Sequence, residues 1–365
     1  MLDGMFVFDN VIHVFDMSDE NLREDESRTR KESEEFRQWL EALGCGGRWP
    51  AFNDPESEFP YGSSMGGRWS TDAVFDMVFK VAPTDMAMAQ VVPIFDFFTD
   101  FFAPVKAQYE MAKAYPDRVL FCGGVDPMYR GVDDALEQLD YQIKELGACS
   151  IKFYNGHVEH SWACDDESIA YPLYQRCLDL GVDVIQFHKG LPLGKTSYAA
   201  MSPLDLERPA RDFPDLNFIV HHLALPMFDE VVWLAGRFPN VYLALSGNLN
   251  TYVIAPRLVQ EQVGRLLMEV GVEKLLYGSE AALAGSPAPY LRAFLDLEIP
   301  DDLRRGYGYP QITRSDKEKI LGLNFANLMG VDLDAKKREL ADQPVFDATL
   351  EGRLLGMGEL VGAAE

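Results

Sequence analysis

The chain has 365 residues, too many for one small domain and enough for an elaborated α/β barrel or two compact domains. Apolar residues make up 47% of it and charged residues 25%, which supplies ample material for a buried core. With 33 Lys and Arg against 58 Asp and Glu, the net charge of −25 repels nucleic-acid phosphates and anionic lipid head groups. We therefore expect no nucleic-acid partner and no membrane partner.

The N-terminal residues lack the basic and apolar segments of a secretory signal, and no apolar run is long enough to span a bilayer. The five cysteines are scattered and form no C-x-x-C motif. Free thiols of this kind are typical of a reducing compartment, so the sequence predicts a cytoplasmic protein.

The first predicted strand is Phe6–His13, and a long insertion, about residues 18–83, follows it. The first half of the insertion is a highly charged helix pattern that predicts a solvated helix. The second half is rich in Gly, Pro and aromatic residues, namely Trp49, Phe52, Phe59, Tyr61 and Trp69. Because this half follows a strand end, it is predicted to be either a lid over the site or a packed surface loop.

Seven further apolar runs predict strands: Met86–Val92, Arg118–Val125, Cys149–Tyr154, Val182–His188, Asn217–His222, Val241–Ser246 and Lys274–Glu280. Most are apolar on both faces, as expected for parallel strands covered on both sides. Helical spacing of apolar residues lies between them, for example from Ala135 to Leu146. Eight strand–helix units predict a (β/α)8 TIM barrel over residues 1–330, with residues 331–365 as a C-terminal arm that could contact another subunit.

Three of the six histidines, His13, His188 and His222, end predicted strands, and Glu280 ends the eighth. The carboxyl ends of barrel strands converge on one mouth. Imidazole and carboxylate ligands gathered there suit zinc, manganese or iron. A single such histidine is more often a buried structural residue, but the set predicts one divalent metal ion, with zinc expected first.

The sequence resembles the amidohydrolase superfamily, in the branch that includes aminocarboxymuconate-semialdehyde and resorcylate decarboxylases. The resemblance runs from Asp9 to about Gly330. It is carried by the first-strand segment DNVIH, by QFHKG and HHLALP at strands five and six, by GSE at strand eight and by the closing ILGLNFANL. It implies a metal-dependent hydrolase or carboxy-lyase with a small-molecule substrate, and a homo-oligomer, expected to be a dimer.

Two departures from the family pattern bear on mechanism. Val11 stands where the family has the first histidine of H-x-H and can donate nothing to a metal, while Asp9, placed on the same face by strand alternation, lies too far down the barrel to replace it. Glu280 stands where the family has Asp. We expect a mononuclear site, in which Glu280 is a ligand, a general acid–base, or both, and in which carboxylation of Lys152 is not expected.

Other candidates each have a structural alternative. His157, His160, Lys189, Lys152 and Ser246 are predicted to contact substrate, although each could be a surface, paired or capping residue. His221 alternates with His222, so it is predicted to face away from the barrel interior and to pack there.

Three functions remain open. In a hydrolase acting on an amide, lactone or ester, Glu280 would handle the proton of a metal-activated water and His222 would stabilise the oxyanion. In a non-oxidative decarboxylase of an aromatic or muconate-like acid, Glu280 would protonate the carbon that loses CO2. The third possibility is a catalytically inactive, ligand-binding barrel.

Overall fold

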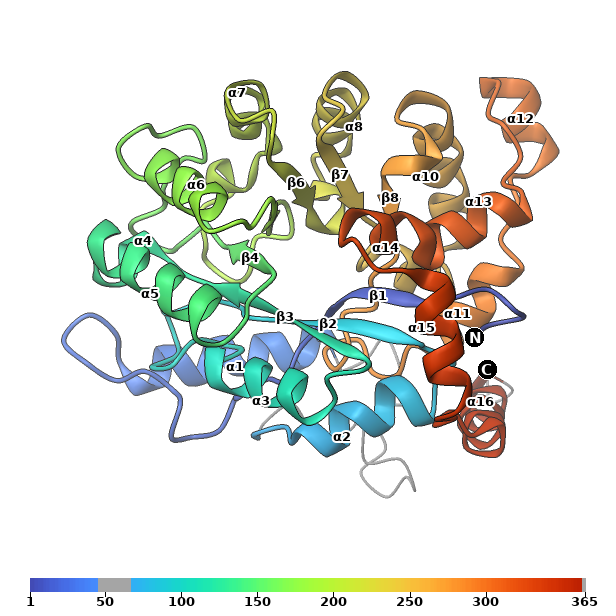
Figure 1. Ribbon diagram of the computed structural model, residues 1–365, viewed down its shortest axis with the longest axis horizontal. Coiled ribbons are helices and arrows are strands. Elements are labelled where there is room, and N and C mark those ends of the chain that lie inside the picture. Colours follow the sequence, from blue (N-terminus) through green and yellow to red (C-terminus); the bar gives the residue numbers. More distant parts are fainter. Residues whose placement is uncertain (45–66, 363–365) are drawn as a thin grey trace.

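The computed structural model describes residues 1–44 and 67–362. Eight parallel strands pair in chain order, which confirms the predicted (β/α)8 barrel (Figure 1). The strands are β1 (Phe8–Ile12), β2 (Met86–Gln90), β3 (Val119–Gly124), β4 (Ser150–Phe153), β5 (Val184–Phe187), β6 (Asn217–Val220), β7 (Val241–Ala244) and β8 (Leu275–Leu276).

Helices separate the strands and surround them in Figure 1. The α-helices are α1 (Arg30–Gly44), α2 (Thr71–Phe75), α3 (Val105–Ala114), α4 (Pro127–Arg130), α5 (Val132–Lys144), α6 (Ala170–Asp179), α7 (Glu207–Asp212), α8 (Phe228–Arg237), α9 (Asn248–Thr251), α10 (Pro256–Glu269), α11 (Ala288–Leu295), α12 (Asp301–Tyr307), α13 (Arg314–Glu318), α14 (Asn324–Leu328), α15 (Leu333–Ala341) and α16 (Ala348–Gly362). Shorter helical segments are η3 (Asp76–Lys80), η4 (Ala199–Met201), η5 (Pro203–Leu206), η6 (His221–Ala224), η7 (Val272–Lys274) and η8 (Lys319–Leu323). Within the described ranges, none of these helices combines the length and the apolarity needed to cross a membrane.

The barrel closes where β8 meets β1, and this junction differs from the predicted one. β8 has two residues, whereas the sequence predicts a strand that runs to Glu280. Beyond Leu276 the chain still follows β1, because Asn10 N donates to Tyr277 O at 3.0 Å and Glu280 N donates to Val11 O at 3.2 Å. Glu280 therefore lies directly beside β1, at the point where the chain leaves the barrel.

The amino-terminal end of the barrel is filled by apolar side chains. Met88, Val184 and Ile219 from the strands pack with Phe325 of α14 beneath them. The rings of Phe8 and Phe325 lie 4.6 Å apart. Because this end is sealed, the polar part of the interior lies toward the carboxyl ends of the strands.

The insertion and the C-terminal segment return to the barrel wall. Helix α1 confirms the charged helix, while Trp49, Phe52, Phe59 and Tyr61 lie outside the described residues. The described end of the insertion rejoins the loop after β1, where Trp69 N donates to Phe15 O at 3.0 Å. In α16, Glu351 forms an ion pair of 2.6 Å with Arg292 of α11. A contact of this segment with another subunit stays a prediction.

Gly322 in η8 provides a test of this packing. A Cβ atom at Gly322 would lie 2.4 Å from the backbone oxygen of Phe6, which cannot move without disturbing the chain before β1. We expect Gly322→Ala to lower the free energy of unfolding by about 1–3 kcal/mol, as overpacked cores do. Gly306 in α12 is the matched control, since a Cβ there meets nothing within 4 Å and Gly306→Ala should be neutral or stabilising by about 0.5–1 kcal/mol. Equal urea midpoints for the two variants would contradict the expectation.

Candidate metal centre

Four strand ends bring polar side chains to the barrel mouth. In β5 the side chains alternate, so Gln186 points into the barrel and His188, two residues later, does the same. After β6 the chain turns through η6, in which His222 has a φ of 60°. Glu280, after β8, has a φ of 58°. Left-handed backbone is strained for residues other than glycine, and such strain is typical of functional sites.

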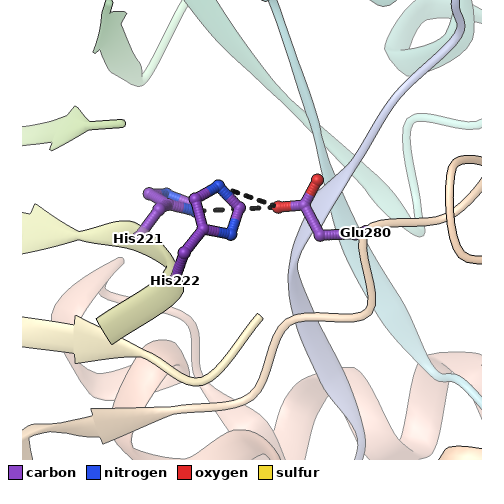
Figure 2. Close-up of side chains that lie close together, drawn as sticks. All are labelled: His221, His222 and Glu280. Atoms are coloured by element: carbon purple, nitrogen blue, oxygen red, sulfur yellow. Dashed lines mark ion pairs between the residues drawn. The ribbon is translucent and has the colours of Figure 1, made fainter. Parts of the chain in front are cut away.

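The four predicted ligands lie together. His188 Nδ1 is 3.1 Å from His222 Nε2, which is 3.8 Å from Glu280 Oε1. The other carboxylate oxygen, Oε2, lies 3.5 Å from His13 Nε2. Figure 2 shows the carboxylate of Glu280 facing the imidazoles that follow β6. The structure therefore places His13, His188, His222 and Glu280 as successive neighbours at the barrel mouth, and their role as metal ligands stays a prediction.

Each of these three imidazoles has a hydrogen-bond acceptor behind it. The pairs are His13 Nδ1 with Gln90 O at 2.7 Å, His188 Nε2 with Leu191 O at 3.2 Å, and His222 Nδ1 with Ser246 Oγ at 3.2 Å and Ser246 O at 3.4 Å. A carbonyl oxygen can only accept, so we assign the ring proton to the outer nitrogen. The inner nitrogen then turns its lone pair toward the centre, which is the arrangement of metal-bound histidines.

Burial keeps the imidazoles of His188 and His222 neutral. It lowers the pKa of His188 well below the usual value and the pKa of His222 to about 4. Burial alone would raise the pKa of Glu280, but the interactions of the carboxyl group with His222, His13 and Lys152 outweigh burial and hold that pKa below its usual range. At neutral pH the centre therefore offers the neutral imidazoles of His188 and His222 and the ionised carboxylate of Glu280, the protonation states that a metal requires.

A divalent ion fits this donor set. Without a cation between them, the lone pair of His13 Nε2 would face the negative Oε2 of Glu280 at 3.5 Å. At metal–ligand bonds of about 2.0–2.1 Å, two ligands of one ion lie about 3–4 Å apart. The separations of 3.1, 3.5 and 3.8 Å between neighbouring donors match that spacing, while the ligand atoms that all lie within 4.8 Å of one another belong, among the described residues, to His221, His222 and Glu280.

The first strand reaches the centre through a bulge. Asp9 pairs with Ala87 and Ile12 pairs with Ala89, so β1 holds one residue more than β2 between these pairs. The predicted alternation is therefore broken. Asn10 reaches the interior and donates to Gln186 Oε1 at 3.1 Å, whereas Asp9 accepts from the backbone N–H groups of Val11 and Ser279.

Two of the five predicted substrate-contacting residues lie at the centre. Ser246 Oγ is the acceptor behind His222. Lys152 is buried, points inward like Ser150 on the same strand, and has no hydrogen-bond or ion-pair partner among the described residues. Burial lowers the pKa of Lys152 to about 8, although the charge of Glu280 opposes this.

The other three lie apart from the centre. Lys189 is fully buried and pairs with Asp205 at 2.7 Å. His160 is exposed on the loop after β4. His157 is buried between two carboxylates, with Nδ1 2.9 Å from Asp96 and Nε2 2.8 Å from Asp126.

Sequence reasoning missed three groups. The prediction that His221 faces away from the interior is wrong, because His221 follows Ile219 on the inward face and its Nε2 lies 2.7 Å from Gln186 Oε1. Gln186 could have been found from the sequence, because it is a polar residue two places before His188 in an otherwise apolar strand. Tyr154, directly after β4, stacks 4.3 Å from the ring of His188, and its hydroxyl has no hydrogen-bond partner among the described residues.

The sequence profile of the amidohydrolase family matches residues 55–330, more than half of the chain, and the protein belongs to that family. An uncharacterised TIM-barrel protein from Bordetella bronchiseptica has a TM-score of 0.59 and 19% identity, over 89% of this chain and 99% of its own. A putative 2-pyrone-4,6-dicarboxylic acid hydrolase from Pseudomonas putida has a TM-score of 0.53 and 14% identity, over 90% of this chain and 99% of its own.

The 5-carboxyvanillate decarboxylase of Sphingomonas paucimobilis has a TM-score of 0.51 and 14% identity, over 90% of this chain and 100% of its own. At such identities the likeness shows the shared barrel. A search of curated protein sequences found no match.

The pKa of His157 gives a test of its surroundings. Burial would lower it, but the charges and hydrogen bonds of Asp126 and Asp96 outweigh burial and raise it to about 10. A raised folded-state pKa contributes stability below pH 6.5, and this contribution is lost as the pH rises toward 10. We expect the NMR signal of the His157 ring to show an imidazolium throughout pH 7–9, and Asp126→Asn to lower the titration midpoint. A midpoint near 6.5 in the unmodified protein would contradict the ion-paired arrangement.

Proposed function

We propose that the protein is a metal-dependent hydrolase that cleaves an amide, lactone or ester-like bond of a small organic substrate. The observation that carries the proposal is that the inward nitrogens of His13 and His222 face the carboxylate of Glu280, with the inward nitrogen of His188 directly beside that of His222. A divalent ion bound there would acidify a water molecule and polarise the scissile carbonyl.

Glu280 is the proposed proton carrier. Oε1 faces His222 while Oε2 faces His13, so one oxygen can contact an ion while the other accepts the proton of the attacking water and returns it to the leaving group. His222 holds the ion, because an Nε2 that ligates cannot also donate a proton to an oxyanion. The ammonium of Lys152, which has no partner among the described residues, is the cation proposed to stabilise negative charge on the substrate.

A decarboxylase is the second candidate, and Lys152 is the observation that favours it. A buried ammonium beside a divalent ion provides two positive charges for a substrate carboxylate and an adjacent oxygen. Loss of CO2 would leave its electron pair on carbon, and Glu280, which is ionised at neutral pH, would first take a proton from water and then deliver it to that carbon. A hydrolase and a decarboxylase both occur among the structural neighbours.

The expectations of zinc as the resident ion, of a homodimer and of a cytoplasmic location remain predictions. Imidazole and carboxylate ligands suit zinc, and suit manganese and iron as well.

Metal content tests the proposal first. We expect about one divalent ion per chain by plasma mass spectrometry, and its loss in His188→Ala, because the inward Nδ1 of His188 would be removed. His160→Ala is the matched control, since His160 is exposed and should leave metal content unchanged. A folded protein that binds no metal, even after reconstitution, would contradict the proposal and favour the catalytically inactive barrel.

A substitution of Lys152 tests whether this residue recognises a negative charge on the substrate. The metal-loaded protein should be screened for CO2 release from aromatic and muconate-like acids and for hydrolysis of lactones, amides and esters. For an anionic substrate we expect Lys152→Met to lower kcat/KM about 10–100-fold, the value of a hydrogen bond to a charged group of about 1.5–3 kcal/mol. The methyl ester of the same acid should lose much less. Equal losses for the acid and its ester would rule out charge recognition by Lys152.

A further inference from the structure

His221, which follows β6 directly before His222, occupies the interior without a role in the centre described so far. Its Nδ1 lies 4.0 Å from Glu280 Oε1 (Figure 2). One ligand atom from each of His221, His222 and Glu280 can be chosen so that all lie within 4.8 Å of one another. All three residues are buried, so these atoms face each other away from bulk solvent.

We propose that His221 is a further ligand of the metal ion, through Nδ1, and that it supplies the donor that Val11 cannot. This inference rests on the metal site of the proposed function and adds a ligand to it.

The position of His221 supports this replacement. The side chain of Val11 lies against Gly278, where Ser246 Cβ is also a close neighbour. His221 Nδ1 lies 3.5 Å from Ser246 Oγ. Ser246 therefore lies beside the imidazole of His221 and near Gly278, against which the side chain of Val11 packs.

Gln186 fixes the tautomer that ligation by Nδ1 requires. Its Oε1 lies 2.7 Å from His221 Nε2 and also accepts from Asn10 Nδ2 at 3.1 Å and Gln90 Nε2 at 2.8 Å. Its Nε2 donates to Ser150 Oγ at 3.1 Å. A flipped amide would set its NH2 group against the donors of Asn10 and Gln90, so the orientation is determined. Nε2 of His221 must then carry the proton, and the lone pair is left on Nδ1.

Gln186 is thus a positioning residue that acts through His221. The same relation holds at His13, where Gln90 O accepts a hydrogen bond from the outer nitrogen, Nδ1, and the inner nitrogen, Nε2, keeps its lone pair. His221 differs in that its acceptor is a side chain, so substitution can remove that acceptor without touching a ligand.

The test measures metal affinity by competition with a chelator, together with the visible absorption of the cobalt-loaded protein. We expect His221→Phe to weaken affinity at least 100-fold and to change the cobalt spectrum. Gln186→Leu should weaken affinity about 10–100-fold, the usual effect of losing a group that orients a ligand. Ser150→Ala is the matched control, because it removes a hydrogen bond from the opposite end of the same amide and should change affinity less than about 3-fold.

The outcomes separate this inference from the proposed function. Suppose that folded His221→Phe keeps the metal affinity and the cobalt spectrum of the wild-type protein, while His188→Ala loses the metal. This result would overturn the role of His221 but would leave the proposed metal site intact. Nδ1 of His221 would then only accept a hydrogen bond from Ser246. If His221→Phe does not fold in thermal melts, Gln186→Leu decides by the same affinity criterion. Absence of metal binding in the wild-type protein would overturn both.

Discussion

The amide of Gln186 is the interaction on which the barrel interior depends. Its oxygen receives three hydrogen bonds, from β1, from β2 and from the residue that follows β6. Its nitrogen donates to Ser150 of β4, and Gln186 itself belongs to β5. One side chain thereby connects five of the eight strands, β1, β2, β4, β5 and β6, in a region buried from bulk solvent, where hydrogen bonds are strong and an unpaired polar group is costly.

Gln186 and its hydrogen-bond partners form a polar layer that separates two chemically different halves of the barrel interior. Below it, Val184, Ile219 and Phe325 form an apolar floor that excludes solvent. Above it, His188 and His221 occupy the next inward positions of the same two strands. The apolar floor therefore stabilises the fold. At the mouth, in contrast, the imidazoles donate hydrogen bonds from their outer nitrogens to fixed acceptors. Such preorganisation is what a metal centre needs, since the ligands do not have to reorient when an ion binds.

Regular periodicity was enough to predict the barrel from the sequence. The runs of β2 to β7 are mostly apolar on both faces, as buried parallel strands are, and the apolar face of α5 follows 3.6-residue spacing. The same rules fail at the centre, for local reasons. A bulge in β1 brings Asn10 rather than Asp9 to the interior, and β8 ends after Leu276 although the chain continues along β1. Neither feature has a sequence pattern of its own, because both depend on how the barrel closes.

The backbone conformation directly after β6 explains how the two consecutive residues His221 and His222 can both face one centre. Strand alternation turns neighbouring side chains to opposite faces, so His221 continues inward after Ile219 and His222 should point out. The φ of 60° at His222 breaks this alternation and returns its imidazole to the mouth. Left-handed backbone at a residue other than glycine is unfavourable and persists where surrounding contacts hold it. Here the hydrogen bond of His222 Nδ1 with Ser246 and the packing of the His222 ring against that of His188 provide that support, so the strain and the centre depend on one another.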